Sequence, residues 1–385
     1  MTAEALQCFA IAAPGLERLV AAELGALGCT PTITQGGVEF TGNARLIYEA
    51  NLRLRVASRI LVRIASFRAR TFHELERHAQ KIPWRDYLAR NGVIALRVTA
   101  RKSKLYHEGA IAERLMTAIE KTVGPVQPRN ALPDDEDAML DDAQMFVVRF
   151  VRDECVVSVD SSGALLHRRG YRQAVAKAPL RETLAAAMLL GSDWDASAPL
   201  VDPMCGSGTI AIEAALIARR IAPGIANLAL EPRAYAFQGW PGFDARTWST
   251  VVENARADVR PNAGVVIHGS DRDAGAITAA HANASRAGVT DDVVFEKLSL
   301  SAANIPAPAA WLVTNPPYGV RVGSGDQRDL YAAVGRVAKE MLTTGRVVLL
   351  TPEPLASRQT GLPLETLFET RNGGITVRLL ATPEL

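Results

Sequence analysis

The chain of 385 residues has only four cysteines, and none of them stands in a CxxC pair or beside histidines at metal-ligand spacing. Neither a disulfide scaffold nor a structural metal site is therefore expected, and the pattern is typical of a reduced cytoplasmic protein. No stretch approaches the roughly 18 consecutive apolar residues of a membrane-spanning helix. The first residues also lack a basic segment followed by an apolar run, so we expect a protein that is neither secreted nor embedded in a membrane.

Excess charge of one sign is lacking overall, since the net charge is only +2, but the charges are unevenly distributed. Residues 45–114 contain 16 Lys or Arg against 6 Asp or Glu, whereas six acidic residues fall within residues 134–142, an expected exposed loop. A local positive excess suits a polyanionic partner such as RNA, and an ordinary solvated surface is the alternative. The length and the 48% hydrophobic content allow two or three domains with their own cores.

Residues 200–209, LVDPMCGSGT, combine the end of a buried strand with a glycine turn and the start of a helix. Asp202-Pro203 stops the strand, because proline donates no hydrogen bond to a sheet. Gly206 and Gly208 permit a tight turn and a close approach of the backbone to a ligand. The residues that follow repeat apolar positions with helical spacing. The stretch predicts a nucleotide-type cradle in a doubly wound α/β sheet, or more plainly a turn that only links strand and helix.

Two missing residues narrow the class of ligand. Thr209 stands where a phosphate-binding P-loop needs lysine, and Ala211 stands at the third glycine position of the dinucleotide fingerprint. S-adenosylmethionine carries no phosphate, and its amino-acid end can be held by the Asp202 carboxylate. Cys205 lies inside this loop and is assigned a backbone role. The loop residues expected to hold the cofactor are Asp202, Pro203, Cys205, Gly206, Ser207, Gly208 and Thr209.

A second motif, NPPYG at residues 315–319, follows another short apolar strand. Methylation of an exocyclic NH2 group requires the nitrogen lone pair to face the methyl donor. The Asn315 side-chain oxygen and the Pro316 carbonyl can accept the two N–H bonds, and the Tyr318 ring can stack on an extruded base. Pro317 stiffens the turn. No strong general base is needed, because the amine attacks while neutral; taken alone, the stretch also fits an ordinary turn with a packed tyrosine.

These motifs resemble those of the THUMP-domain class I S-adenosylmethionine-dependent RNA methyltransferases, and most closely the bacterial family that forms N2-methylguanosine in 23S ribosomal RNA. The resemblance extends over nearly the whole chain, and its other distinctive stretches are FAIAAPGLE at 9–17, NLRLRVASR at 51–59, RKSKLYH at 101–107, HRRGYR at 167–172 and APLRETLAAA at 178–187. It implies in-line methyl transfer to the exocyclic amine of a flipped base.

The resemblance also implies an α/β fold with an α+β region before it. The implied parts are a ferredoxin-like domain at 1–60, a THUMP RNA-binding domain at 61–165, a linker at 166–178, and a class I, Rossmann-like methyltransferase domain with a seven-stranded sheet at 179–385. Residues 367–380, which are split by Asn372-Gly373-Gly374, predict the antiparallel hairpin that ends such a sheet.

Further site residues follow the strands expected at 265–269 and 293–297. Asp271 ends the first, and its carboxylate can accept both ribose hydroxyls of a nucleoside. Ser299 follows the second, where relatives usually place an aspartate for the adenine, and it is a weaker acceptor. Asn315 is expected to contact the cofactor as well as the base. The residues expected to contact RNA are Arg101, Lys102, Lys104, Arg168, Arg169, Arg172 and Arg321.

Other functions remain open on the sequence alone. The nearest alternative is a guanine-N2 methyltransferase of transfer RNA, and N6-methylation of adenine uses the same NPPY geometry. A ribosome-assembly factor that binds RNA without turnover belongs to a different class. Aromatic residues in the long connection at 221–262 are expected to pack as a satellite core, or alternatively to shape the base pocket.

Overall fold

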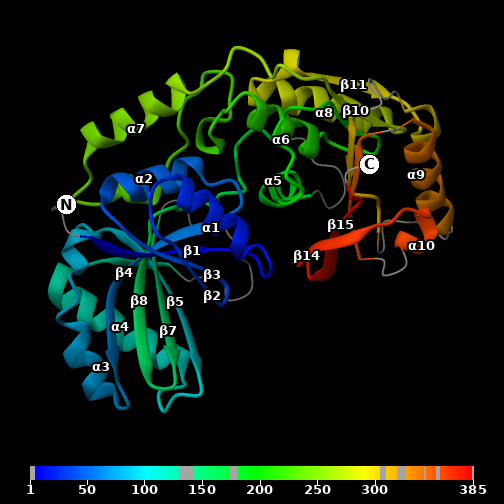
Figure 1. The fold of residues 1–385 in the computed structure, drawn as a ribbon. Coiled ribbons are helices and arrows are strands. Elements are labelled where there is room, and N and C mark those ends of the chain that lie inside the picture. Colours follow the sequence, from blue (N-terminus) through cyan, green and yellow to red (C-terminus); the bar gives the residue numbers. More distant parts are fainter. Residues whose placement is uncertain are drawn as a thin grey trace.

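The computed structural model describes residues 5–129, 143–173, 180–303, 309–318, 327–341, 344–352 and 356–383. Two sheets organise this part of the chain, one of eight strands in the N-terminal half and one of seven in the C-terminal half (Figure 1). None of the helices within these ranges is long and apolar enough to cross a membrane. The predicted acidic loop at 134–142 lies outside the described residues.

The N-terminal sheet has the strand order β2-β3-β1-β4-β8-β7-β5-β6. Its strands are β1 (Leu6–Ile11), β2 (Thr32–Thr34), β3 (Gly37–Gly42), β4 (Arg59–Arg68), β5 (Val93–Arg101), β6 (Gln127–Arg129), β7 (Gln144–Val151) and β8 (Glu154–Asp160). Its helices are α1 (Glu17–Ala26), α2 (Ala44–Arg53), α3 (Phe72–Ala79), α4 (Glu108–Val123) and the 3-10 helix η1 (Trp84–Asp86). The side chains of Asn43 and Thr71 cap the first turns of α2 and α3 by accepting backbone N–H bonds, which is why both helices begin where they do.

Strand β4 joins the two parts that the sequence predicts as separate domains. Its first residues pair antiparallel with β1, from Arg59 opposite Ile11 to Arg63 opposite Gln7. From Leu61 onward it also pairs with β8 on its other side. The boundary predicted at residue 60 therefore falls inside a strand, and one continuous sheet runs through both parts.

The C-terminal sheet has the order β11-β10-β9-β12-β13-β15-β14. Its strands are β9 (Leu200–Asp202), β10 (Ile267–Asp271), β11 (Val293–Lys297), β12 (Trp311–Thr314), β13 (Arg346–Thr351), β14 (Glu365–Asn372) and β15 (Ile375–Ala381). Helices in this half are α5 (Glu182–Gly191), α6 (Thr209–Ala218), α7 (Ala245–Ala257), α8 (Ala274–Ala287), α9 (Gln327–Met341) and α10 (Ala356–Thr360), with η2 (Pro223–Ile225), η3 (Ala236–Gly239), η4 (Thr290–Asp292) and η5 (Leu300–Ala302). Strands β9 to β13 pair in parallel and β14 and β15 form the antiparallel hairpin, so the predicted class I sheet is confirmed.

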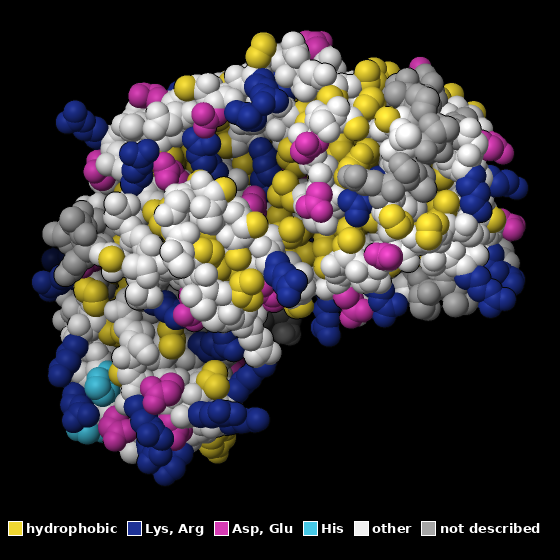
Figure 2. Space-filling model, viewed as in Figure 1, with side chains coloured by type: hydrophobic (Ala, Val, Ile, Leu, Met, Phe, Trp, Pro, Cys, Tyr) yellow, Lys and Arg dark blue, Asp and Glu magenta, His cyan; other side chains and the backbone are white. Residues whose placement is uncertain are grey.

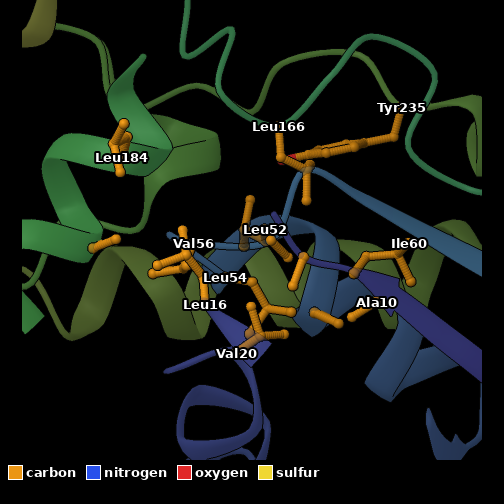
Figure 3. Packing of buried hydrophobic residues seen from close by; sticks show 14 of the residues in the cluster. Ala10, Leu16, Val20, Leu52, Leu54, Val56, Ile60, Leu166, Leu184 and Tyr235 are labelled. Carbon is orange, nitrogen blue, oxygen red and sulfur yellow. The ribbon is translucent and has the colours of Figure 1, made fainter. Parts of the chain in front are cut away.

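The two halves share one hydrophobic core. Figure 3 shows Leu16 and Val56 from the N-terminal half in the same cluster as Leu166, Leu184 and Tyr235. The aromatic residues of the long connection extend this core: they pack around Tyr48 of α2, whose ring centroid lies 4.4 Å from that of Phe237. The prediction that these aromatics pack as core is confirmed, but they belong to the main core rather than to a separate satellite, and the packing ties the connection to the N-terminal half.

Candidate active site

Adjacent parallel strands bring the two sequence motifs together. Strands β9 and β12 are parallel neighbours: Trp311 lies opposite Leu200, and Leu312 lies opposite Val201. Both strands therefore end at the same edge of the sheet, the one formed by their carboxyl ends. At that edge the hydroxyl of Thr314 donates a 2.7 Å hydrogen bond to Oδ1 of Asp202, and both residues are buried. NPPY therefore begins one residue after a side chain that is bonded to the start of the glycine loop.

The glycine loop after β9 is held by the neighbouring strand β10. Its Cys205 N–H donates to the Ser270 carbonyl at 2.9 Å, and its Gly206 N–H donates to the Asp271 carboxylate at 3.0 Å. Gly208 caps α6 with a φ of +83°, and a Cβ there would lie 2.7 Å from the Phe295 ring, so this position requires glycine.

Gly206 has the opposite surroundings. Its φ is +53°, and a Cβ built on it would meet no atom of the described structure within 4 Å. The outer face of the loop is thus open, as a ligand cradle requires, although a side chain would still be strained by the backbone conformation. Burial, with the nearby carboxylates of Asp202 and Asp271, raises the pKa of the Cys205 thiol well above its ordinary value. A protonated, buried thiol agrees with a backbone role for Cys205 rather than a nucleophilic one.

Asp202 is the most perturbed acid of the site. Its pKa is raised from 3.8 to about 7, chiefly by burial and to a smaller extent by the neighbouring Asp271, while bonds from Thr314 and from the Met204 N–H act in the opposite direction. The carboxylate is 1% exposed. Such a group changes charge near neutral pH and responds to any cation placed beside it, which is typical of functional carboxylates.

Asp271 and Ser299 end the next two strands. Asp271 is half-buried, and its carboxylate accepts from the Gly206 N–H and, at 2.9 Å, from the Asp273 N–H. It therefore shapes the loop, a role that the sequence did not predict, and a carboxylate has lone pairs left for hydroxyl donors. Ser299 precedes η5 and is exposed, with its hydroxyl 3.2 Å from that of Ser301.

The residues of NPPY differ in exposure. Pro316 is buried and Pro317 is exposed. The Asn315 side-chain oxygen is buried and has no hydrogen-bond partner among the described residues. Since leaving a buried acceptor unpaired costs about 1–3 kcal/mol, this atom is a strong candidate for binding a ligand N–H group.

Tyr318 is placed differently from the expectation. Its ring is 2% exposed, and its hydroxyl accepts a 2.6 Å hydrogen bond from the Asn372 side chain at the end of β14. Stacking on a base would require the ring to leave this packing, so the structure does not present the predicted platform and the stacking role stays a prediction. Asn372, which the sequence analysis treated only as a turn residue, anchors the ring.

Two of the predicted RNA contacts are corrected. Arg169 is 4% exposed and donates to the backbone carbonyls of Leu166 and Arg55, with its Nε 3.6 Å from Glu213. Arg172 forms a two-point ion pair with Glu182 at 2.8 and 3.0 Å, and the side chains of this pair are 12% and 2% exposed. These guanidinium groups hold the protein interior together, so they do not form an RNA surface.

The other predicted RNA contacts lie elsewhere. Arg168 is half-buried and lines a cavity of about 520 Å³, together with Tyr87 and Arg233. Arg101, Lys102 and Lys104 are exposed at the end of β5 that is far from the glycine loop. Figure 2 shows Lys and Arg side chains at this distal end of the N-terminal half, interspersed with Asp and Glu. Arg321 lies outside the described residues.

The fold and the glycine loop define a class I methyltransferase, and comparison with known proteins identifies the family. Residues 169–359 match the RMKL-like methyltransferase domain, and residues 7–61 match the RlmL ferredoxin-like domain. The chain belongs to this RMKL-like methyltransferase family. The prediction of a ferredoxin-like start is confirmed, whereas the THUMP assignment of residues 61–165 stays a prediction.

Individual relatives agree over nearly the whole chain. A Synechocystis protein named "putative RNA methyltransferase" is 33% identical over 97% of this chain and 95% of its own length. The ribosomal RNA large subunit methyltransferase K/L of Syntrophotalea carbinolica is 37% identical over 97% of this chain, which spans only 53% of that protein. The crystal structure of SMU.472, described as a "putative methyltransferase" complexed with SAH, superimposes with a TM-score of 0.87 at 30% identity, covering 100% of this chain and 99% of that one.

Proposed function

We propose that this chain is an S-adenosylmethionine-dependent RNA methyltransferase that forms N2-methylguanosine in 23S ribosomal RNA. Family membership, the ribosomal RNA relative and the SAH-bound neighbour support the cofactor and the RNA substrate. Because the chain spans 53% of the K/L relative, the activity of that longer protein is carried over only as a proposal.

One observation carries the proposal more than any other. The 2.7 Å bond from Thr314 to Asp202 joins the glycine loop to NPPY, and the next residue presents a buried oxygen without a partner in the described structure. An unpaired acceptor beside a cofactor loop suits an NH2 group that must be oriented before it is methylated. We therefore assign base binding to Asn315 and to the Pro316 carbonyl.

The loop has the properties that the cofactor needs. When bound, S-adenosylmethionine supplies an electrophilic methyl group on a sulfonium sulfur. The open face at Gly206 admits a ligand against the backbone, and the Asp202 carboxylate is placed to attract a positively charged amino-acid end. We assign the remaining contacts to the rest of the loop, to Asp271 and to the exposed Ser299. The cofactor residues are thus Asp202, Pro203, Cys205, Gly206, Ser207, Gly208, Thr209, Asp271, Ser299 and Asn315.

Asn315 and Pro316 act by orientation rather than by removing a proton. Two carbonyl oxygens that accept the N–H bonds of an exocyclic amine turn its lone pair toward the methyl donor. Fixed acceptors in a site shielded from water stabilise the positive charge that develops on the nitrogen. The proton leaves after transfer, so no residue with a matched pKa is required. Among the described residues of the site, the acids with strongly shifted pKa values, Asp202 and Cys205, both belong to the cofactor loop, which agrees with this scheme.

Nucleoside analysis tests the proposal directly. The purified chain is incubated with S-adenosylmethionine carrying a labelled methyl group and with 23S ribosomal RNA, transfer RNA or poly(A), and the digested nucleosides are separated by mass spectrometry. Labelled N2-methylguanosine from the ribosomal RNA is the expected result. The same nucleoside from transfer RNA alone would redirect the substrate, and labelled N6-methyladenosine would overturn the guanine assignment. Absence of cofactor binding in calorimetry, with and without RNA, would leave only the assembly factor.

A further inference from the structure

A buried asparagine outside both motifs holds the glycine loop. Asn283 of α8 is 0% exposed, and its side-chain N–H donates a 3.0 Å hydrogen bond to the carbonyl of Ser207, between the two loop glycines. Arg286, one turn further along α8, donates to the Asn283 side-chain oxygen. The amide is thus fixed with its oxygen toward the guanidinium and its NH2 group toward the loop.

The contact continues away from the loop as a polar chain. The Arg286 Nε donates to the Tyr171 carbonyl at 2.7 Å, and the Tyr171 hydroxyl donates to Glu213 at 3.0 Å. Glu213 lies on α6 beside Arg169, which in turn donates to the Arg55 carbonyl at 2.6 Å. Hydrogen bonds, together with the 3.6 Å ion pair between Arg169 and Glu213, therefore connect the Ser207 carbonyl with the segment that follows α2 in the N-terminal half.

We infer that Asn283 is a positioning residue for the cofactor loop, and that Arg286 orients the Asn283 amide by donating to its oxygen, on the side away from the loop. The inference rests on the proposed function. Both loop glycines have positive φ, at +53° and +83°, so the backbone on either side of Ser207 has more conformational freedom than an ordinary loop. The bond from Asn283 removes this freedom, because the peptide carbonyl it holds lies between the two flexible positions. The loop is thereby held in its ligand-free state in the shape that binding requires, which lowers the entropy cost of binding.

Asn283→Asp is the sharpest test, because it changes neither the size nor the shape of the side chain. An ionised aspartate still accepts from Arg286 but faces the Ser207 carbonyl with an oxygen in place of a donor. Loss of one buried hydrogen bond predicts about a tenfold or larger loss of affinity for SAH in calorimetry at pH 8. The KM for S-adenosylmethionine should rise by a similar factor, while the KM for RNA stays unchanged. Arg286→Met, which frees the amide without touching the loop, should weaken SAH binding in the same direction by a smaller factor.

Asn51→Asp is the matched control. Asn51 is also buried, and its side-chain N–H groups donate to Ile47 and Ser161 in the N-terminal half. This variant should lose thermal stability but bind SAH as the wild type does. Unchanged SAH affinity in Asn283→Asp would overturn the inference, as would an equal loss in Asn51→Asp. If Asn283→Asp does not fold, Arg286→Met decides in its place. Failure of the wild type to bind SAH would instead overturn the proposed function, so the two failures are distinguishable.

Discussion

Replacing Thr314 with valine tests the junction between the two motifs. Valine has almost the same shape as threonine, so the buried site keeps its packing and loses only the hydroxyl that donates to Asp202 at 2.7 Å. That donation favours the ionised carboxylate. The variant should therefore raise the pKa of Asp202 above its wild-type value of about 7.

The direction of the effect follows from proton binding. Since Asp202 has a pKa of about 7 in the folded protein against 3.8 for an ordinary aspartate, the folded state binds the proton more tightly and the free energy of unfolding falls as pH rises between these values. This difference in pKa corresponds to a fall of about 4 kcal/mol in the free energy of unfolding between pH 3.8 and about 7. A hydrogen bond to a charged group contributes roughly 1.5–3 kcal/mol. In the wild type the Thr314 hydroxyl can also bond to the protonated acid, so only the difference between the two bonds shifts the pKa. We therefore expect Thr314→Val to raise the pKa of Asp202 by roughly one pH unit, or about 1.4 kcal/mol.

Calorimetry with SAH from pH 5.5 to 9 measures this shift. If the ionised Asp202 attracts the amino group of the cofactor, wild-type affinity rises with pH and levels off above about 7, and the variant needs a higher pH to reach its plateau. Thr382→Val is the control, because Thr382 is an equally buried threonine whose hydroxyl accepts from the Val347 N–H of β13, two strands away from β9. A pH midpoint that is the same in the wild type and in Thr314→Val would refute the reasoning, whatever the change in stability.

Three further predictions concern the base, the RNA and the interior. Asn315→Ala should lower kcat by roughly a hundredfold, about 3 kcal/mol, as for other preorganised hydrogen-bond groups. SAH affinity should change little, because the other cofactor residues supply most of the contacts to SAH, and an equal loss of SAH binding would make Asn315 a structural residue. Replacing Arg101, Lys102 and Lys104 together by glutamine should weaken RNA binding and flatten its dependence on salt in titrations from low to moderate ionic strength; an unchanged slope would show that this end of β5 faces away from RNA. Arg169→Met should lower the thermal midpoint, because buried Glu213 loses its ion pair, although it keeps the bond from Tyr171, and two carbonyls lose their donor. The cost should be about 3–5 kcal/mol, and the salt slope should stay as it is.

Much of the C-terminal sheet could be predicted because its elements have local signals at both ends. Helix α8 is such an element, since Asp273 caps its first turn and Gly288 ends it in the left-handed conformation. Strand β10 shows where local signals fail. It was predicted at 265–269 and lies at Ile267–Asp271, because pairing starts only where its short neighbour β9 begins, with Ile267 opposite Leu200. Strand ends depend on the partner strand, which the apolar run does not reveal.

The site was predictable as two motifs but not as one arrangement. Leu200, Asp202 and Asn315 belong to motifs whose chemistry can be read from residue types. The bond that joins the motifs comes from Thr314, an unremarkable strand residue whose role depends on the order of strands in the sheet. Asn283 could have been noticed as a polar residue on the apolar face of α8, which Ile277, Ala280 and Ala287 define. Only the fold shows that this face meets the loop.

Cations were the least predictable class of residue, and the reason is general. A guanidinium has five N–H donors, and backbone carbonyls satisfy them as well as phosphates do. Arg233 illustrates this with bonds to the carbonyls of Ser162, Ala164, Leu165 and Arg168, and Arg59 is 9% exposed beside Asp160. Residues 45–114 therefore offer fewer cations to RNA than their count implies, because some of these side chains, such as Arg59, are buried and bind groups inside the protein. The RNA footprint should then be concentrated at the distal end of β5, and the salt dependence of RNA binding should reflect the few exposed charges there rather than the whole basic region.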